Sequence, residues 1–258
     1  MTRVFETPSE WRIERLSQLQ NGVTLGLVPT MGALHEGHLS LVRRSRAENG
    51  RTLVTIFVNP TQFDDPTDLA RYPRTLEDDL AKLDAEGTDF VLVPRDADLY
   101  PSGNRYRVTE SELSTVLEGA ERPGHFEGVL TVVMKLLQIA SAERAYFGEK
   151  DWQQLTLVRG MADAFFLPTV IVGCATVREA DGLAISSRNQ RLLPSDRPRA
   201  PQVYRALSSA PTAEAARRDL CAAGFAVDYV EECDGRRLGA VRLGGVRLID
   251  NVPLGGGS

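Results

Sequence analysis

VPTMGALHEGHLSLV, residues 28–42, links an apolar run to a glycine-bearing loop and an amphipathic segment. The apolar run Leu25–Val28 predicts a strand that ends at Pro29, and a helical pattern begins at about His38. A strand, a loop and a helix start in this order direct backbone N–H groups and the positive end of the helix dipole toward an anion. This stretch therefore predicts a phosphate site at the carboxyl end of a strand.

Two of the three histidines in the chain, His35 and His38, lie in this loop. Their spacing of three residues lets both rings face one pocket at the helix start. Gly32 and Gly37 are also compatible with ordinary turns, and the histidines with a helix cap. The two histidines are not spaced i and i+4, as the zinc metalloprotease motif requires, so zinc is not expected. The combination of strand, glycines, histidines and helix favours phosphate binding.

The chain on both sides of this stretch alternates between strand and helix patterns. A leader helix has Trp11, Ile13, Leu16 and Leu19 at helical spacing, and Thr75 stands at an expected N-cap. Further strands are predicted at Thr52–Val58, Asp89–Val93, Ala145–Phe147 and Thr169–Val172, and further helices at Phe126–Ala140 and Trp152–Ala164. The alternation predicts an α/β fold with a Rossmann-like, mostly parallel sheet and helices on both faces.

The character of the sequence changes after about Val177, where a polar stretch and several prolines follow. Short strands are expected at Asp228–Val230 and Val246–Ile249, and the final LGGGS predicts a frayed end. We therefore predict two domains, residues 1–177 and a smaller α+β domain of residues 178–258. The broken pattern between Pro94 and Pro123 predicts loops with short strands.

Composition limits the classes of function. The formal net charge of −5 over 258 residues argues against nucleic-acid binding. No apolar stretch approaches the ~20 residues of a membrane span, and the N-terminus lacks the apolar segment of a signal peptide. The three cysteines show no Cys-x-x-Cys spacing, so neither a disulfide framework nor a zinc ribbon is indicated. A cytoplasmic protein is expected.

Three further loops carry polar groups that an α/β core does not need. Asn59 and Gln62 follow a predicted strand and suit a ligand with hydroxyl and carboxylate groups, although an Asn-Pro turn explains them as well. Lys150 follows Gly148 and suits phosphate, but acids at a helix start are also ordinary caps. Ser186–Asn189, SSRN, forms either a phosphate clamp or a polar hinge.

The chemistry that these groups support is displacement at phosphorus. A Gly-x-x-x-x-Gly-Lys-Ser/Thr loop and a Gly-x-Ser-x-Gly elbow are both absent from the sequence. Attack on the α-phosphorus of ATP, with pyrophosphate leaving, needs charge neutralisation and alignment but no protein nucleophile. The predicted pocket offers those two things.

At this point the motifs resemble those of a known family. PTMGALHEGH, FVNPTQF, YPRT, RPGHFEGV, GEKDWQQL and TVREADGLAISSRN occur in order, and RLIDN follows near the C-terminus. Together they resemble the pantothenate synthetase (pantoate–β-alanine ligase) family of the nucleotidylyl-transferase superfamily, with its HxGH motif. The resemblance implies that (R)-pantoate and ATP form pantoyl-adenylate and pyrophosphate, after which β-alanine displaces AMP. It also implies Mg²⁺ with the ATP, a homodimer, and a C-terminal domain that acts as a lid.

The same resemblance implies roles for individual residues. His38, as proton donor, His35, Lys150 and Arg188 would be catalytic, and Gln62, Gln154, Asn59 and His125 would bind the substrates. Magnesium would involve Asp78 and Asp79, whose alternative is a helix cap. The implied ATP site consists of Met31, Gly32, Ala33, Leu34, His35, Glu36, Gly37, His38, Gly148, Glu149, Lys150, Asp151, Val177, Ile185, Ser186, Ser187 and Arg188.

The sequence departs from the family pattern mainly in the segment Pro194–Asp228, which is shorter than usual. A shorter lid would expose the adenylate to water or loosen the choice of amine. Two alternatives therefore stand beside the main hypothesis. One is a related AMP-forming amide ligase with a different acid or amine, and the other is a nucleotidyltransferase without the amide-forming step.

Overall fold

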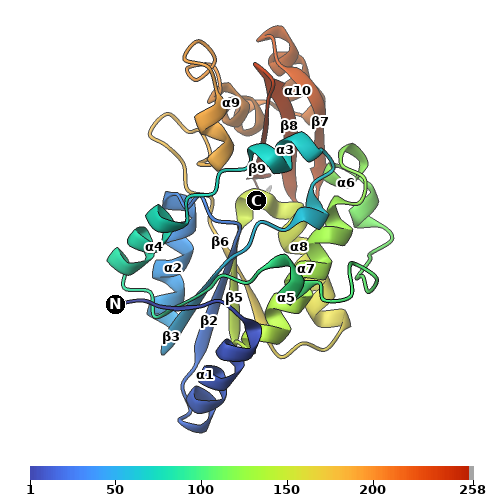
Figure 1. The fold of residues 1–258 in the computed structure, drawn as a ribbon. Coiled ribbons are helices and arrows are strands. Elements are labelled where there is room, and N and C mark those ends of the chain that lie inside the picture. Colours follow the sequence, from blue (N-terminus) through green and yellow to red (C-terminus); the bar gives the residue numbers. More distant parts are fainter. Residues whose placement is uncertain (256–258) are drawn as a thin grey trace. The chain divides into compact units, whose positions relative to one another are not determined.

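The computed structural model describes residues 1–255 and divides the chain into two compact units (Figure 1). The first unit comprises Met1–Gly148 and Gln153–Cys174, and the second comprises Glu149–Trp152 and the chain from Ala175 onward. The division after Cys174 lies three residues before the predicted boundary. The short segment Glu149–Trp152 groups with the second unit, which the sequence did not indicate. The predicted fraying covers LGGGS, residues 254–258, of which 256–258 lie outside the described part.

The first unit is built on a six-stranded sheet in which all neighbouring strands are parallel. Its order is β1-β4-β3-β2-β5-β6, so the predicted α/β class is confirmed. The sequence analysis missed β1, which has only three residues. The bounds are β1 Arg3–Phe5, β2 Leu25–Thr30, β3 Arg51–Ile56, β4 Phe90–Leu92, β5 Arg144–Gly148 and β6 Val170–Cys174.

Helices cover both faces of this sheet. The α-helices are α1 Pro8–Gln20, α2 Glu36–Glu48, α3 Pro66–Arg71, α4 Leu76–Ala85, α5 Asp96–Leu99, α6 Glu118–Glu121, α7 His125–Ala140 and α8 Trp152–Ala164. Short 3-10 helices of this unit are η1 Pro60–Gln62 and η2 Leu113–Thr115, whereas η3 Glu149–Asp151 belongs to the second unit. The prediction of short strands between Pro94 and Pro123 was therefore wrong, because the short helices α5, η2 and α6 lie there instead.

Close approach of α2 to the sheet depends on one glycine. A Cβ at Gly26 of β2 would lie 2.1 Å from Oγ of Ser45 and 2.6 Å from Nδ2 of Asn49, both in or just after α2. Leu41 and Val42 of α2 and Leu83 of α4 form a buried cluster with strand residues on this face. On the other face, α1 and α7 are joined by a hydrogen bond from Trp11 Nε1 to the Ile139 carbonyl.

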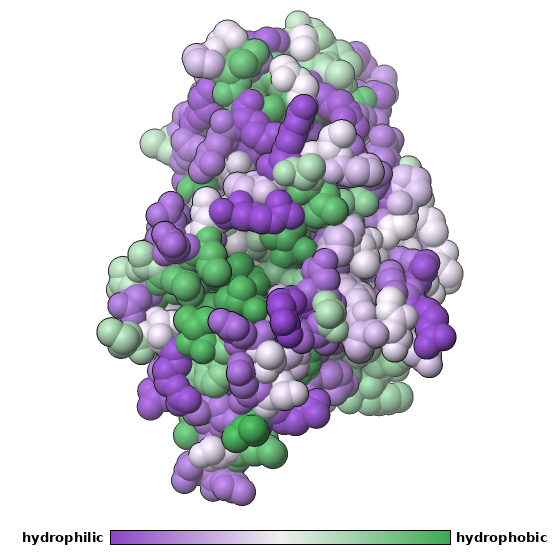
Figure 2. Space-filling view, in the orientation of Figure 1, coloured by the Kyte–Doolittle hydropathy of each residue, from purple (hydrophilic) through white to green (hydrophobic). Residues whose placement is uncertain are grey.

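The leader helix α1 forms as predicted but turns a different side to the protein. It buries Trp11, Arg15 and Gln18, whereas the predicted apolar residues Ile13, Leu16 and Leu19 are 74%, 55% and 46% exposed. Hydrophobic residues are visible on this helix at the lower end of Figure 2. The reason is Arg15, whose guanidinium donates to the carbonyls of Ser141 and Val23 and to the Glu143 carboxylate.

The second unit is α+β, as expected. Helices α9 Gln202–Ser209 and α10 Ala213–Ala222 pack on an antiparallel sheet of β7 Ala226–Cys233, β8 Arg236–Leu243 and β9 Val246–Pro253. The predicted strands at 228 and 246 are longer than expected, and β8 was missed. The buried hydrophobic cluster of the second unit includes Leu207, Leu220, Val241 and Leu248. Within residues 1–255, no helix combines the length and apolarity that crossing a bilayer requires.

Candidate active site

The histidine pair lies at the start of α2. His35 is the N-cap with an extended backbone, and the helix begins at Glu36, two residues before the predicted start. The rings of His35 and His38 stack with their centroids 4.0 Å apart and an interplanar angle of 20°. The His35 N–H donates to Nδ1 of His38 over 3.4 Å. Neutral His38 therefore carries its proton on Nε2, as a proton donor to a ligand would.

Asp79 of α4 holds the loop that precedes the histidines. Its side chain is buried, and its two oxygens accept the backbone N–H groups of Ala33 at 2.8 Å and Leu34 at 2.7 Å. Lys82, one turn further along α4, donates to the Leu34 carbonyl at 2.9 Å. These two N–H groups are thus satisfied within the protein. Our expectation that free N–H groups of this loop point at phosphate does not apply to them.

The predicted magnesium site at Asp78 and Asp79 does not fit this arrangement. Both Asp79 oxygens already serve the loop, and the Lys82 ammonium bonds to the same loop. Asp78 is exposed on the helix surface. Across the described residues 1–255, no group of three or more His, Cys, Asp or Glu side chains is placed to hold a metal ion. The backbone N–H groups that Asp79 accepts belong to this neighbouring loop and not to the start of α4, whose N-cap is Thr75.

Backbone groups fix the orientation of the Asn59 amide. The Thr61 N–H donates to Oδ1 at 3.3 Å, and Nδ2 donates to the Gly128 carbonyl at 3.2 Å. A backbone N–H can only donate and a carbonyl can only accept, so the two ends of the amide are distinguished. Nδ2 of Asn59 also donates to Oε1 of Gln62 at 2.9 Å. Gln62 is therefore left with its Nε2 donors, one of which lies 3.3 Å from Sδ of Met31.

Tyr100 holds the Asn59 side chain by a hydrogen bond. Its hydroxyl donates to Oδ1 of Asn59 at 2.7 Å, and burial raises the pKa of this phenol, which keeps it a donor. The Lys135 ammonium lies 3.9 Å from the centre of the Tyr100 ring and donates to the Leu99 carbonyl at 2.7 Å. This chain of contacts leads from α7 through Tyr100 to the Asn59–Gln62 pair.

His125, predicted to line the substrate pocket, uses both ring nitrogens within the protein. Arg122 donates to Nε2 at 3.1 Å, so Nδ1–H donates to the Gln62 carbonyl at 2.8 Å. Burial, and then the Arg122 charge, lower the pKa of His125 to about 4. The ring is thus neutral near pH 7, and its contact is with the backbone of Gln62.

The loops of the first unit meet at one edge of its sheet. Strands β3, β2 and β5 are neighbours and parallel, so the segments after them begin at the same carboxyl edge (Figure 1). Gly148 ends β5, and a Cβ there would meet no atom within 4 Å. On α8, Gln153 is buried and bonded to Leu113, Val116 and Glu118. The predicted substrate residue Gln154 is half-buried.

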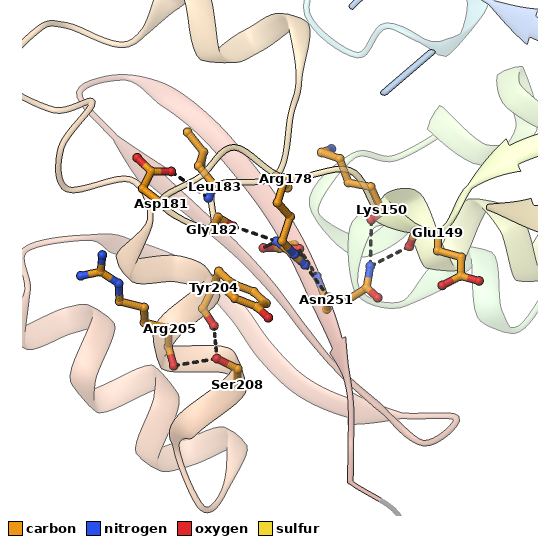
Figure 3. Close-up of polar contacts among 12 residues, drawn as sticks. Glu149, Lys150, Arg178, Asp181, Gly182, Leu183, Tyr204, Arg205, Ser208 and Asn251 are labelled. Atoms are coloured by element: carbon orange, nitrogen blue, oxygen red, sulfur yellow. Dashed lines mark hydrogen bonds and ion pairs between the residues drawn. The ribbon is translucent and has the colours of Figure 1, made fainter. Parts of the chain in front are cut away.

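In the second unit, Lys150 lies in η3 beside β9. Nδ2 of Asn251 donates to the carbonyls of Glu149 and Lys150, both at 2.9 Å (Figure 3). Oδ1 of Asn251 accepts from Nε of Arg236, whose guanidinium also stacks on the Trp152 ring at 4.2 Å. The lysine backbone is thereby anchored to the C-terminal sheet.

The predicted nucleotide loop is anchored to the same strand. Arg178 forms two hydrogen bonds to Asp250, at 2.6 and 2.9 Å, and lies 3.9 Å from the centre of the Tyr204 ring. Ile185 N–H donates to the Val177 carbonyl at 3.0 Å, so these two predicted ATP residues lie side by side. Ser186 caps the following 3-10 helix, η4 Ser187–Arg191, by accepting the Arg188 N–H.

Comparison with known proteins decides the family. The family model described as pantoate–β-alanine ligase matches residues 3–253. The chain belongs to the pantoate–β-alanine ligase family. A pantothenate synthetase of Bdellovibrio bacteriovorus is 52% identical over 254 residues, which cover 98% of this chain and 100% of that protein. One of Coxiella burnetii is 47% identical and covers 98% of both.

Solved structures of pantoate–β-alanine ligases have the same fold. One from Francisella tularensis, complexed with β-γ ATP and β-alanine, superposes with a TM-score of 0.93 at 38% identity, over 100% of this chain and 99% of that one. One from Thermus thermophilus gives 0.89 at 41% identity, over 98% and 99%. Membership of this ligase family makes the chain an enzyme that forms an amide bond.

The structure adds residues to the family motifs that sequence analysis missed. Asp79 was considered only as a metal ligand or cap, and Tyr100, Arg178, Asp250 and Asn251 were not singled out. The motif RLIDN contained the signal for the last two, because a strand interior rarely buries an Asp-Asn pair without partners.

The Glu36 carboxylate, predicted in the ATP site, is exposed and bonded to Arg43, which lowers the pKa of Glu36.

Proposed function

We propose that this chain condenses (R)-pantoate with β-alanine in a reaction driven by ATP. A pantoate carboxylate oxygen attacks the α-phosphorus, and the bond from this phosphorus to the bridging oxygen breaks, so that pyrophosphate leaves. The β-alanine amine then attacks the acyl carbon of pantoyl-adenylate, AMP leaves with the electron pair, and the amine proton passes to solvent. Magnesium enters as part of the MgATP substrate.

The observation that carries this proposal is the Met31–Gln62–Asn59 contact. It joins the loop of the histidine pair to a glutamine that donates one Nε2 hydrogen to Met31 and has the other for a ligand. Donors suit the carboxylate and hydroxyl oxygens of pantoate. This cluster occurs in a chain that matches the family over nearly its whole length. The bound ATP and β-alanine of the Francisella protein support the same substrates here.

In this proposal the histidines and cations act on charge. His38 donates from Nε2 to the bridging oxygen of the departing pyrophosphate, and the stacked His35 keeps its ring in place. Lys150 and Arg188 neutralise the triphosphate, with Ser186 and Ser187 as hydroxyl donors. Gln154 assists Gln62 in binding pantoate. The Val177 and Gly148 backbones border the nucleoside.

The reaction itself tests the proposal. Pyrophosphate release should require both pantoate and ATP, and pantothenate should form with equimolar AMP once β-alanine is added. Release of pyrophosphate without any amide would indicate a nucleotidyltransferase instead. Assays with other acids and amines separate pantoate and β-alanine from different substrates.

Replacement of His38 by alanine should slow adenylate formation by ~10²–10³, the usual effect of removing one preorganised charge-stabilising donor. Single-turnover pyrophosphate release measures this step apart from amide formation. A variant that folds and forms the adenylate at the wild-type rate would refute the role of His38.

A homodimer and a cytoplasmic location are further parts of the proposal and rest on the resemblance to the family. Sedimentation equilibrium of the purified chain tests the dimer.

A further inference from the structure

Two consecutive buried residues of β9 contact both segments predicted to bind ATP. Asp250 is 6% exposed and Asn251 is 2% exposed, and their side chains serve different partners. Asn251 donates to the Lys150 carbonyl in η3 (Figure 3). Asp250 accepts from Arg178 at the base of the nucleotide loop. Helix α8 and strand β6 lie between these two segments in the sequence.

The Asn251 side chain is fully used. Nδ2 has two hydrogens, and it donates one to the Glu149 carbonyl and one to the Lys150 carbonyl. Oδ1 accepts from Arg236 at 2.6 Å, and Arg236 in turn approaches the Glu149 carboxylate at 3.6 Å. An amide is the side chain that meets this need, because a carboxylate of the same shape would have no hydrogen to donate to the carbonyls.

Asp250 fixes the second segment through Arg178. The paired hydrogen bonds between this carboxylate and guanidinium define the orientation of the arginine plane, which also lies against Tyr204. Arg178 donates further to the Gly182 carbonyl, inside the tight turn of the loop. Oδ1 of Asp250 also accepts the backbone N–H of Asn251, so the two residues are coupled.

We propose that Asp250 and Asn251 are positioning residues for the triphosphate site. They hold the backbone of Lys150 and the base of the Val177–Arg188 loop in one fixed arrangement without touching substrate. This inference rests on the proposed ATP-dependent reaction. Loss of either residue weakens ATP binding and adenylate formation, while pantoate binding, assigned to the first unit, is unaffected.

The sharpest variant is N251D, which keeps the shape and replaces the two donors by acceptors. We expect the KM for ATP to rise about tenfold or more, as for two hydrogen bonds lost within a binding site. The KM for pantoate should stay within about twofold, a difference too small to reflect a lost hydrogen bond.

N49D is the matched control, because Nδ2 of Asn49 also donates to a backbone carbonyl and its Oδ1 accepts from Arg144. Asn49 ends α2 at the opposite end from the histidines.

The variant D250N tests the contact of Asp250 with Arg178, and D228N is its control. Asp228 of β7 also pairs with two arginines, Arg242 and Arg247, but contacts neither ATP segment in the described residues. We expect D250N to raise the KM for ATP and D228N to leave it unchanged. Urea unfolding of all four variants shows whether a loss of activity comes from loss of the fold.

A double-mutant cycle separates positioning from general stability. If Asn251 acts through Lys150, then N251D should weaken binding of a non-hydrolysable ATP analogue in wild-type background and have little further effect in K150A. Calorimetry measures this binding without turnover. Additive effects of N251D and K150A, or a wild-type KM for ATP in N251D, would overturn the inference. Absence of pantothenate formation by the wild-type chain would instead overturn the proposed function.

Discussion

At the scale of single residues, the candidate site depends on side chains that hold backbone groups. Asp79 accepts two consecutive N–H groups of the loop before His35, and His125 donates to the carbonyl of Gln62. These residues position the groups that meet substrate. Their substitution should therefore change catalysis through geometry, and the buried partners left behind should lower stability.

D79N should lower the free energy of unfolding by about 1–3 kcal/mol, because the amide offers only one acceptor oxygen to the N–H groups of Ala33 and Leu34. The loop that leads to His35 and His38 should shift, and adenylate formation should slow. Urea unfolding and single-turnover pyrophosphate release measure the two effects. D78N, an exposed neighbour, is the matched control and should match the wild type. Equal stability of D79N and D78N would contradict the loop-holding role.

Stability should depend on pH through His125. Its pKa of about 4 in the folded protein lies below the ordinary 6.5, so the unfolded chain binds the proton first. The free energy of unfolding should therefore fall as the pH falls from about 6.5 to about 4, by at most about 3 kcal/mol from this group.

H125N removes the titrating group and keeps a donor for the Gln62 carbonyl. Urea unfolding of both proteins between pH 4 and pH 7 should show a shallower decline in the variant. Parallel curves would mean that His125 titrates normally.

At the scale of elements, α7 lies against η1 so closely that only glycine fits at the contact. A Cβ at Gly128 would lie 2.3 Å from the Thr61 carbonyl oxygen and 2.7 Å from the Gln62 nitrogen. These atoms are backbone, so they yield only if η1 moves. The position of Gln62 thus depends on the face of a helix that begins at His125.

G128A should push η1 away and raise the KM for pantoate several-fold, with a smaller effect on the KM for ATP. G160A on α8 is the control, because its added Cβ meets nothing within 4 Å. Alanine there should stabilise the helix by up to about 1 kcal/mol. Steady-state kinetics and thermal unfolding compare the two. An unchanged KM for pantoate in G128A would show that η1 tolerates the displacement.

Elements whose apolar residues follow a simple period were predictable. The runs that became β2, β3, β4 and β5 were found within a few residues, because buried parallel strands consist of continuous apolar sequence. The run of β6 was found as well, although this edge strand is largely not buried. The side of α1 that faces solvent was not predictable from its apolar spacing. It depends on the hydrogen bonds that Arg15 donates to Ser141, Val23 and Glu143, which come together only in the fold. β8 was missed because arginines interrupt its apolar pattern. Arg237 is buried because its guanidinium donates to the Leu207 and Ala210 carbonyls and to the Glu232 carboxylate.

The candidate site was predictable in its motifs but not in its supports. The alternation of strands and helices predicted that the loops of His35, His38, Asn59 and Gln62 begin at one edge of a parallel sheet. The roles of Asp79 and Tyr100 depend on contacts between segments at least 40 residues apart, which no local pattern encodes. His125 was associated with the pocket, but its partner, the Gln62 backbone, is visible only in the fold.

At the scale of the whole molecule, each unit has its own buried hydrophobic cluster. One contains residues of β2, β3, α2 and α4, and the other contains residues of α9, α10 and the C-terminal sheet. We therefore expect the two units to unfold as separate cooperative blocks. The two tryptophans report on them individually, because Trp11 belongs to the first unit and Trp152 to the second.

L207A should lower the unfolding midpoint reported by Trp152 in a W11F background, since truncating a fully buried leucine typically costs ~2–5 kcal/mol. The midpoint reported by Trp11 in a W152F background should not move. Fluorescence during urea titration gives both midpoints. Equal shifts of both would show that the chain unfolds as one cooperative block.

The length of the C-terminal segment also belongs to this scale. The Bdellovibrio relative aligns over its entire length across 254 residues, so chains of this size occur elsewhere among pantothenate synthetases. Whether the shorter Pro194–Asp228 segment alters amine choice stays a prediction for the substrate assays.

The chain passes between its two units three times, after Gly148, after Trp152 and after Cys174. Exchange of parts between homologous enzymes must respect this path. A chimera that receives a foreign C-terminal half from Ala175 onward would keep its own Glu149–Trp152 against a β9 selected for another partner. Grafts that transfer those four residues together with the C-terminal half should retain a working nucleotide pocket, whereas grafts cut at a single junction should lose it.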